Sequence, residues 1–283
     1  MHTTDPDGRL TTYRRDGLTF EVSDQGPEQG TPVVLLHGFP QLNTCWQRVA
    51  PLLHAEGFRT LAPNQRGYSP GARPTGRRAY KTSELVRDVA ALVDEVGGPV
   101  HLVGHDWGAA VAWAAAIMHP EMLRTLTAVS VPHPGAFMKA MPRGQALDSW
   151  YMAMFNIPWL PERLLTDRRL AQRMMRRFGM TPEMFATFRR DFGDGEALRG
   201  GLAWYRALPL ANPKLFGVAV HVPTTYVWSD RDAALGRTGA ELCREYVDAP
   251  YRFEVLEGCS HWIPDERPDD LARIILERAG SVS

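Results

Sequence analysis

The sequence predicts an α/β fold in which a mostly parallel central sheet is flanked by helices and carries an inserted helical cap. Three observations support this prediction. Short apolar segments rich in β-branched residues alternate with helical patterns through the first half of the chain. Two similar segments lie near the C-terminus. Between these two regions, residues 134–221 show no convincing strand pattern, and methionine, aromatic and arginine residues recur there at helical spacing.

The first half of the chain alternates predicted strands and helices. Residues 32–36 and 100–103 are short apolar runs, which is typical of buried strands. Between them, residues 46–56 show helical spacing ended by glycine, and residues 59–63 read as a strand stopped by proline. The alanine-rich stretch 109–118 predicts a helix with a small-residue face that can pack closely on a sheet.

Later strands are predicted on both sides of the cap, at residues 126–131, 222–228 and 251–256. Inside the cap, helical spacing is found in four segments: 150–165, 170–178, 182–192 and 198–208. We therefore expect three parts. The first part of the sheet domain spans residues 1–133, the cap spans 134–221, and the second part of the sheet domain spans 222–283.

Composition and charge narrow the possible functions. The 283 residues are 44% hydrophobic and carry 32 basic and 32 acidic side chains, so the chain has no net field to attract nucleic acid or an anionic membrane. The three cysteines are widely spaced, which suggests neither a disulfide framework nor a zinc site. The N-terminus is polar, and the longest apolar run is about half of a membrane span. We expect a soluble, cytoplasmic monomer or homodimer that binds a small molecule.

Gly104-His105-Asp106-Trp107-Gly108 lies between a predicted strand and a predicted helix. Small residues two positions before and after the centre are the layout of a nucleophile elbow, a strained turn that projects its apex side chain over the sheet edge. The apex here is Asp106, so a serine nucleophile is excluded at this position. The competing interpretation is that Asp106 only caps the following helix.

Two further segments complete the pattern expected for the α/β-hydrolase fold. The loop His-Gly-Phe-Pro follows the first buried strand, and its Phe39 backbone N–H, together with that of Trp107, is expected to form an oxyanion hole. His261 lies in a loop late in the chain, and Asp232 follows an earlier strand. The order nucleophile, acid, histidine predicts a triad of Asp106, Asp232 and His261, with Asp230 as the rival acid.

The motifs GHDWGA, HGFP, WSxxD and SHWIPDERP together resemble the soluble epoxide hydrolases of the α/β-hydrolase superfamily, over essentially the whole chain. Members of that family open the oxirane with paired cap tyrosines. Residues 149–155 and 202–206 resemble the two tyrosine motifs, which implies that Tyr151 and Tyr205 have this role. The first match departs from the usual wording, because methionines stand where polar or aromatic residues are common.

The resemblance implies an epoxide hydrolase that converts an apolar epoxide and water to a vicinal diol through a covalent ester on Asp106. Tyr151 and Tyr205 would hydrogen-bond the departing oxygen and, with Trp107, contact the substrate. His261, oriented by Asp232, would activate water to hydrolyse the ester. No metal or organic cofactor is expected.

Two alternatives stay open at this point. A haloalkane dehalogenase shares the aspartate nucleophile and often the tryptophan after it, but Phe39 stands where common dehalogenases carry asparagine. A fluoroacetate dehalogenase is a weaker match, because its pattern is HDRG. From a different class, the chain could be a non-catalytic binding protein, although such proteins commonly lose a triad residue. The arginine-rich stretch 163–177 is interpreted as a solvated helix face rather than an anion site.

Overall fold

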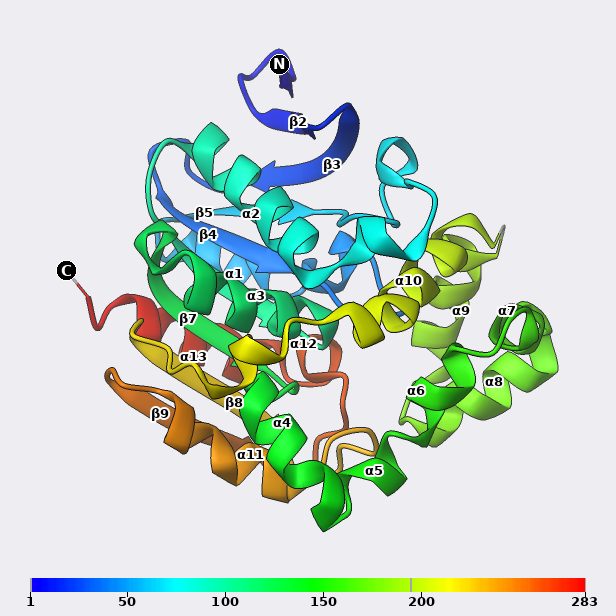
Figure 1. Cartoon of the computed structure of the whole chain (residues 1–283). Coiled ribbons are helices and arrows are strands. Elements are labelled where there is room, and N and C mark those ends of the chain that lie inside the picture. Colours follow the sequence, from blue (N-terminus) through cyan, green and yellow to red (C-terminus); the bar gives the residue numbers. More distant parts are fainter. Residues whose placement is uncertain (1, 194, 283) are drawn as a thin grey trace.

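The computed structural model describes residues 2–193 and 195–282. Nine strands form one sheet in the order β1-β2-β3-β5-β4-β6-β7-β8-β9 (Figure 1). From β5 to β9 the neighbouring strands pair in parallel, whereas β1, β2 and β3 pair antiparallel. The strand bounds, in chain order, are Thr3–Thr4, Leu10–Arg15, Leu18–Gln25, Thr31–Leu36, Phe58–Pro63, Val100–His105, Leu123–Val129, Thr224–Ser229 and Tyr251–Leu256.

Each predicted strand is present, with its limits moved by no more than three residues. The N-terminal strands β1–β3 are an addition that the sequence interpretation did not identify. The helix expected at 46–56 is also shorter than predicted. It consists of a 3-10 turn at Asn43–Trp46 followed by α1, Ala50–Ala55, because Pro51 at the start of α1 suits a first helical turn and not a helix interior.

Helices cover both faces of the sheet. On one face, α1 and α13 (Pro268–Ala279) pack against each other and bury their apolar side chains on the strands, with the short α12 (Ile263–Glu266) beside them. On the other face, α2 (Thr82–Val96) and α3 (Trp107–Met118) do the same, and α11 (Arg237–Leu242) lies further along this face. Two apolar cores therefore enclose the sheet, which is the usual arrangement for parallel strands buried on both faces.

The chain between β7 and β8 is helical. Its α-helices are α4 to α10, with bounds Pro134–Ala140, Gln145–Asp148, Trp150–Phe155, Leu160–Thr166, Arg168–Arg177, Pro182–Phe192 and Glu196–Ala207. Within the described part of this segment, the only strand-like pairing is a single bridge between Val220 and Val247. Helices α6 to α10 stand to one side of the sheet, whereas α4 packs beside α11 (Figure 1). The limits 134 and 221 for a separate cap stay a prediction.

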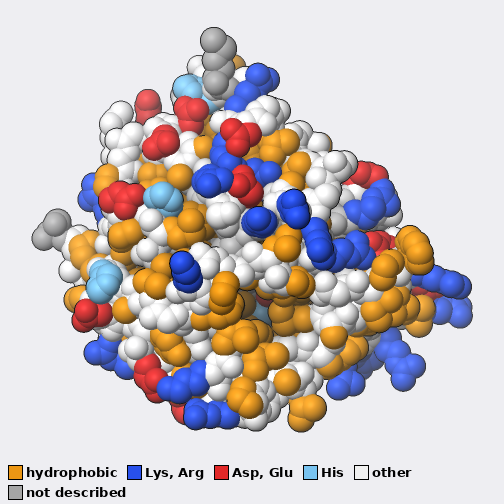
Figure 2. Space-filling model, in the orientation of Figure 1, with side chains coloured by type: hydrophobic (Ala, Val, Ile, Leu, Met, Phe, Trp, Pro, Cys, Tyr) orange, Lys and Arg blue, Asp and Glu red, His pale blue; other side chains and the backbone are white. Residues whose placement is uncertain are grey.

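The surface reflects these layers. Hydrophobic side chains gather over the region between α4 and α10 on the face shown in Figure 2, and basic side chains lie along the outer edge of the cap. No helix in the described ranges is both long enough and apolar enough to cross a membrane.

Candidate active site

Asp106 lies at the apex of the turn between β6 and α3, with φ 52° and ψ −120°. The flanking glycines are required by space, because a Cβ at Gly108 would lie 2.1 Å from the carbonyl oxygen of Leu36, and one at Gly104 would lie 2.2 Å from that of Gly108. Asp106 occupies the N-cap position of α3, yet its side chain makes no capping hydrogen bond. Helix capping therefore does not explain this aspartate.

The loop after β4 touches the carboxylate of Asp106. The backbone N–H of Phe39 donates to Oδ1 at 2.7 Å, and a Cβ on Gly38 would lie 2.4 Å from the same oxygen. Only glycine lets the loop approach this closely. The other expected donor is the backbone N–H of Trp107. Within the described residues it makes no hydrogen bond to Asp106. Trp107 is the first residue of α3, so its N–H is one of the groups at the helix N-terminus that have no partner within the helix.

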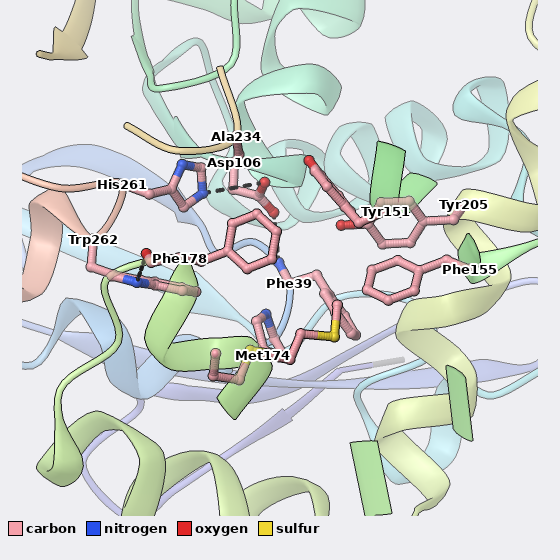
Figure 3. A pocket seen from close by; sticks show the side chains of 12 residues that line it. Phe39, Asp106, Tyr151, Phe155, Met174, Phe178, Tyr205, Ala234, His261 and Trp262 are labelled. Carbon is pink, nitrogen blue, oxygen red and sulfur yellow. Dashed lines mark hydrogen bonds and ion pairs between the residues drawn. The ribbon is translucent and has the colours of Figure 1, made fainter. Parts of the chain in front are cut away.

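His261 faces two carboxylates, as Figure 3 shows for one of them. Its Nδ1 lies 2.7 Å from Oδ2 of Asp232, and its Nε2 lies 3.5 Å from Oδ2 of Asp106. Oδ1 of Asp232 accepts from the backbone N–H groups of Ala234 and Leu235, which fixes the acid. The rival Asp230 instead accepts from the backbone N–H of Gly258. The predicted nucleophile, acid and histidine are thus brought together, with Asp232 and not Asp230 on the imidazole.

These contacts shift the acidities of the site. Burial alone would lower the pKa of His261, but the carboxylates of Asp232 and Asp106 raise it to about 10. Burial opposes ionisation of Asp106, and the hydrogen bond and charge of His261 outweigh it, so the pKa of Asp106 falls below its ordinary value. Both shifts favour the charged forms, an aspartate paired with an imidazolium.

The two cap tyrosines face the same carboxylate from the opposite side. Tyr151 on α6 and Tyr205 on α10 have ring centroids 6.2 Å apart, and both hydroxyls point toward Asp106 in Figure 3. Burial, with the nearby charge of Asp106, raises the pKa of both phenols. They therefore stay protonated and can donate hydrogen bonds. Tyr205 also packs edge-on against Trp107, at a centroid distance of 5.0 Å.

Two cavities meet at this cluster, and both are lined by Asp106, Tyr151 and Tyr205. The smaller one has a volume of about 40 Å³ and includes His261 in its lining. The larger one has a volume of about 600 Å³ and extends along Trp107. A small-ligand site of this volume with a few convergent polar groups is typical of an enzyme pocket.

Sequence reasoning missed several residues of the site. Met174 and Phe178 line the smaller cavity, and nothing in their helical spacing distinguishes them from core residues. His105 was given no role of its own in the sequence analysis. Its ring centroid lies 5.0 Å from that of His261, and its Nε2 lies 2.9 Å from the carbonyl oxygen of His261. Its position directly before Asp106 was the available signal. Burial lowers the pKa of His105 to about 4, so this ring is neutral.

The described part of the chain has no group of three or more His, Cys, Asp or Glu side chains that could hold a metal ion. The three cysteines are free and buried. The expectation that the chemistry needs no cofactor stays a prediction.

Comparison with known proteins points in one direction. Residues 33–274 match the alpha/beta hydrolase family. The chain is 33% identical to the AB hydrolase superfamily protein YfhM of Bacillus subtilis, covering 93% of this chain and 94% of that protein. It is 31% identical to Epoxide hydrolase A of Mycobacterium tuberculosis over 93% of this chain and 94% of that protein. It is also 31% identical to human Epoxide hydrolase 4, over 92% and 75% of the two chains.

Solved structures agree with this result. The crystal structure of Epoxide Hydrolase A from Mycobacterium thermoresistibile superimposes with a TM-score of 0.84 at 26% identity, covering 96% of this chain and 98% of that one. An epoxide hydrolase from Vigna radiata gives a TM-score of 0.81 at 25% identity, covering 95% and 97%.

Proposed function

Because the chain belongs to the α/β-hydrolase family, we propose that it is an epoxide hydrolase that converts an apolar epoxide to a vicinal diol. The observation that carries the proposal is the position of Asp106, which has the His261–Asp232 pair on one side and two protonated phenols on the other. An oxirane needs a nucleophile at carbon and a hydrogen-bond donor at oxygen, and this arrangement supplies both. Relatives named epoxide hydrolases support the same activity.

In the first half-reaction, Oδ2 of Asp106 attacks an oxirane carbon, forming a C–O ester bond as the C–O bond of the ring breaks. Oδ1 is the oxygen held by the N–H of Phe39, and Oδ2, which faces Nε2 of His261, is the attacking atom. Tyr151 and Tyr205 donate hydrogen bonds to the oxygen that departs with negative charge. Their raised pKa keeps the protons in place until that charge develops.

In the second half-reaction, water hydrolyses the ester. Once Asp106 is esterified it is neutral, so it no longer raises the pKa of His261. The imidazolium then gives its proton to the alkoxide left by ring opening, and the neutral imidazole acts as a general base that takes a proton from water, with Asp232 holding Nδ1. The hydroxide attacks the ester carbonyl, and the N–H groups of Phe39 and Trp107 stabilise the oxyanion. The bond between the carbonyl carbon and the substrate oxygen then breaks, that oxygen takes the proton of the new carboxyl group, and the diol leaves with the carboxylate of Asp106 and the imidazolium restored.

The dehalogenase alternative is less well supported. Trp107 packs edge-on against Tyr205 and does not by itself distinguish the two activities. Phe39 presents an apolar ring, packed 5.5 Å from that of Tyr205, where a halide would need a second donor. A non-catalytic role is also disfavoured, because Asp106, Asp232 and His261 lie at hydrogen-bonding or near-contact distances.

The proposal is tested by incubating the protein with styrene oxide, and separately with 1-bromobutane, in ¹⁸O-water. In a single turnover the diol should carry unlabelled oxygen from Asp106, and after repeated turnover the peptide containing Asp106 should be labelled. Asp106→Ala should form no diol above background, because the nucleophile is absent. Diol formation by Asp106→Ala would contradict the covalent route, and bromide release without any diol would favour the dehalogenase.

A further inference from the structure

The two cavities that meet at Asp106 differ about fifteenfold in volume, about 40 Å³ against about 600 Å³. They share Asp106, Tyr151 and Tyr205, so a substrate whose oxirane lies between the carboxylate and the phenols can place its two ends in different cavities. One end is directed toward His261 and the other along Trp107. The space available to the two ends is therefore unequal.

The side of His261 is narrowed by side chains of the cap. The indole N–H of Trp262 donates to the carbonyl oxygen of Phe178 at 2.8 Å, which ties the cap to the histidine loop (Figure 3). A Cβ on Gly179 would lie 2.8 Å from Cβ of Ser260, so the two loops are in close contact. The rings and thioethers of the cap fill the remaining space. They come mainly from Phe155, Met174, Met175 and Phe178.

The side of Trp107 is larger and apolar. Its cavity runs between α3, α4 and the two 3-10 helices at Leu208–Leu210 and Pro213–Gly217. A volume near 600 Å³ suits a ligand of drug size, and aliphatic or aromatic residues make up most of the lining. By contrast, a void needs only about 10–15 Å³ to hold one water molecule, so the smaller cavity suits a few waters or a methyl group.

We propose that the substrate is an epoxide with a single long apolar substituent, which lies in the larger cavity, while the other oxirane carbon carries only hydrogen or methyl. The smaller cavity then also holds the hydrolytic water, because it is the one that contains both His261 and Asp106. This inference rests on the proposed epoxide hydrolysis and adds the substrate class to it. Epoxides with a bulky group on both carbons are excluded by the packing of the cap.

Two isomers of the same formula test the shape of the site. Racemic 1,2-epoxydecane carries one octyl chain, whereas trans-5,6-epoxydecane carries a butyl chain on each carbon, so the two differ in shape and hardly in apolarity. We expect kcat/KM to be at least about 100-fold higher for the 1,2-isomer, since each methylene that a site cannot accommodate weakens transition-state binding by about 10-fold or more. Diol is measured by gas chromatography for both, with styrene oxide as a reference substrate.

A variant tests whether the side chains of the smaller cavity set the preference for the 1,2-isomer. Met174→Ala, which shortens a half-buried side chain of α8 in the smaller cavity, should lower the preference for the 1,2-isomer about tenfold by admitting the second chain. Leu170→Ala is the matched control, because Leu170 lies on the same helix, is 47% exposed and lines neither cavity. It should leave the isomer ratio unchanged. The unfolding midpoints of both variants are measured to confirm that they are folded.

The outcomes separate this inference from the proposed function. Comparable kcat/KM values for the two decane isomers, or a preference for the 5,6-isomer, would overturn the inference and leave epoxide hydrolysis intact. The same holds if styrene oxide is hydrolysed and neither decane isomer is. If none of the three epoxides gives diol, the proposed function fails and the inference with it.

Discussion

At the scale of residues, the site is a set of charges balanced against burial. The contact between Nε2 of His261 and Oδ2 of Asp106 lowers the pKa of Asp106, and Asp232 and Asp106 together raise the pKa of His261. Under the proposed mechanism, the same contact lets one imidazole serve both steps. The imidazole would be charged while Asp106 is an anion and would become a base once Asp106 is esterified.

Replacing Asp106 with asparagine should therefore lower the pKa of His261 from about 10. The sign follows from the loss of one of the two anions that stabilise the imidazolium. Because Asp232 still contacts Nδ1, part of the elevation should be retained. NMR titration of the imidazole carbons measures the change.

Asp230→Asn is the control for this titration. Asp230 accepts a hydrogen bond from the backbone N–H of Gly258 and does not contact the ring, so the pKa of His261 should move far less than in Asp106→Asn. Equal shifts in the two variants would mean that general charge, and not the contact with Asp106, sets the acidity of the histidine.

At the scale of elements, the elbow depends on two backbones in near contact. Gly108→Ala should lower the free energy of unfolding by about 1–3 kcal/mol or more, because the new Cβ would lie 2.1 Å from the carbonyl oxygen of Leu36 and backbone must move. Urea denaturation followed by circular dichroism measures the loss. Diol formation should fall as well, since Asp106 is carried by the same turn.

Gly98→Ala is the matched substitution outside the elbow. Gly98 has no atom within 4 Å of an added Cβ, so stability should change by no more than about 0.5 kcal/mol. A similar destabilisation at both glycines would show that loss of backbone freedom, and not the contact with Leu36, is responsible for the effect.

The N-terminal hairpin of β2 and β3 has a clear sequence signal, although the sequence analysis did not predict it. Strands β2 and β3 are joined by the two residues Asp16 and Gly17, both with positive φ, at 49° and 77°. Asp-Gly between alternating apolar residues is a strong local signal for such a turn. The side chains that it brings to the core, Tyr13 and Phe20, stack at 4.8 Å.

At the scale of the whole molecule, a buried ion network joins distant segments. Asp88 on α2 accepts two hydrogen bonds from Arg66, both at 2.7 Å, and one from Arg15 of β2 at 2.8 Å. The backbone carbonyl of Arg66 in turn accepts from the indole N–H of Trp204 on cap helix α10. The hairpin, the sheet domain and the cap are thus fixed to one another at a single point.

Asp88→Ala should lower the free energy of unfolding by about 3–5 kcal/mol, because it leaves the largely buried guanidinium groups of Arg66 and Arg15 without this carboxylate. The control is Asp94→Ala on the same helix, where the aspartate is exposed and the expected change is within about 0.5 kcal/mol. Chemical denaturation measures both. A loss below about 1 kcal/mol for Asp88→Ala would mean that the network contributes little to stability.

The sequence by itself determined the parallel sheet, the elbow at Asp106 and the loop at Phe39. Each of these features is encoded by residues close together in the sequence. The backbone of a sharp turn requires small residues near its apex, and a short apolar run predicts a buried strand. The order of Asp106, Asp232 and His261 along the chain was equally readable. The sequence did not decide between Asp230 and Asp232 as the acid, because the two positions lie in one loop and differ only in where their side chains point.

Only the tertiary structure decided which aspartate contacts His261 and how the space around Asp106 is divided. Met174 and Phe178 line the smaller cavity, whereas residues of α3 and α4 line the larger one. A cavity is the volume left over after segments far apart in the chain have packed, so no local pattern encodes its size. The predicted nucleophile can therefore be read from the sequence, whereas the shape of the cavities around it is decided only by the fold.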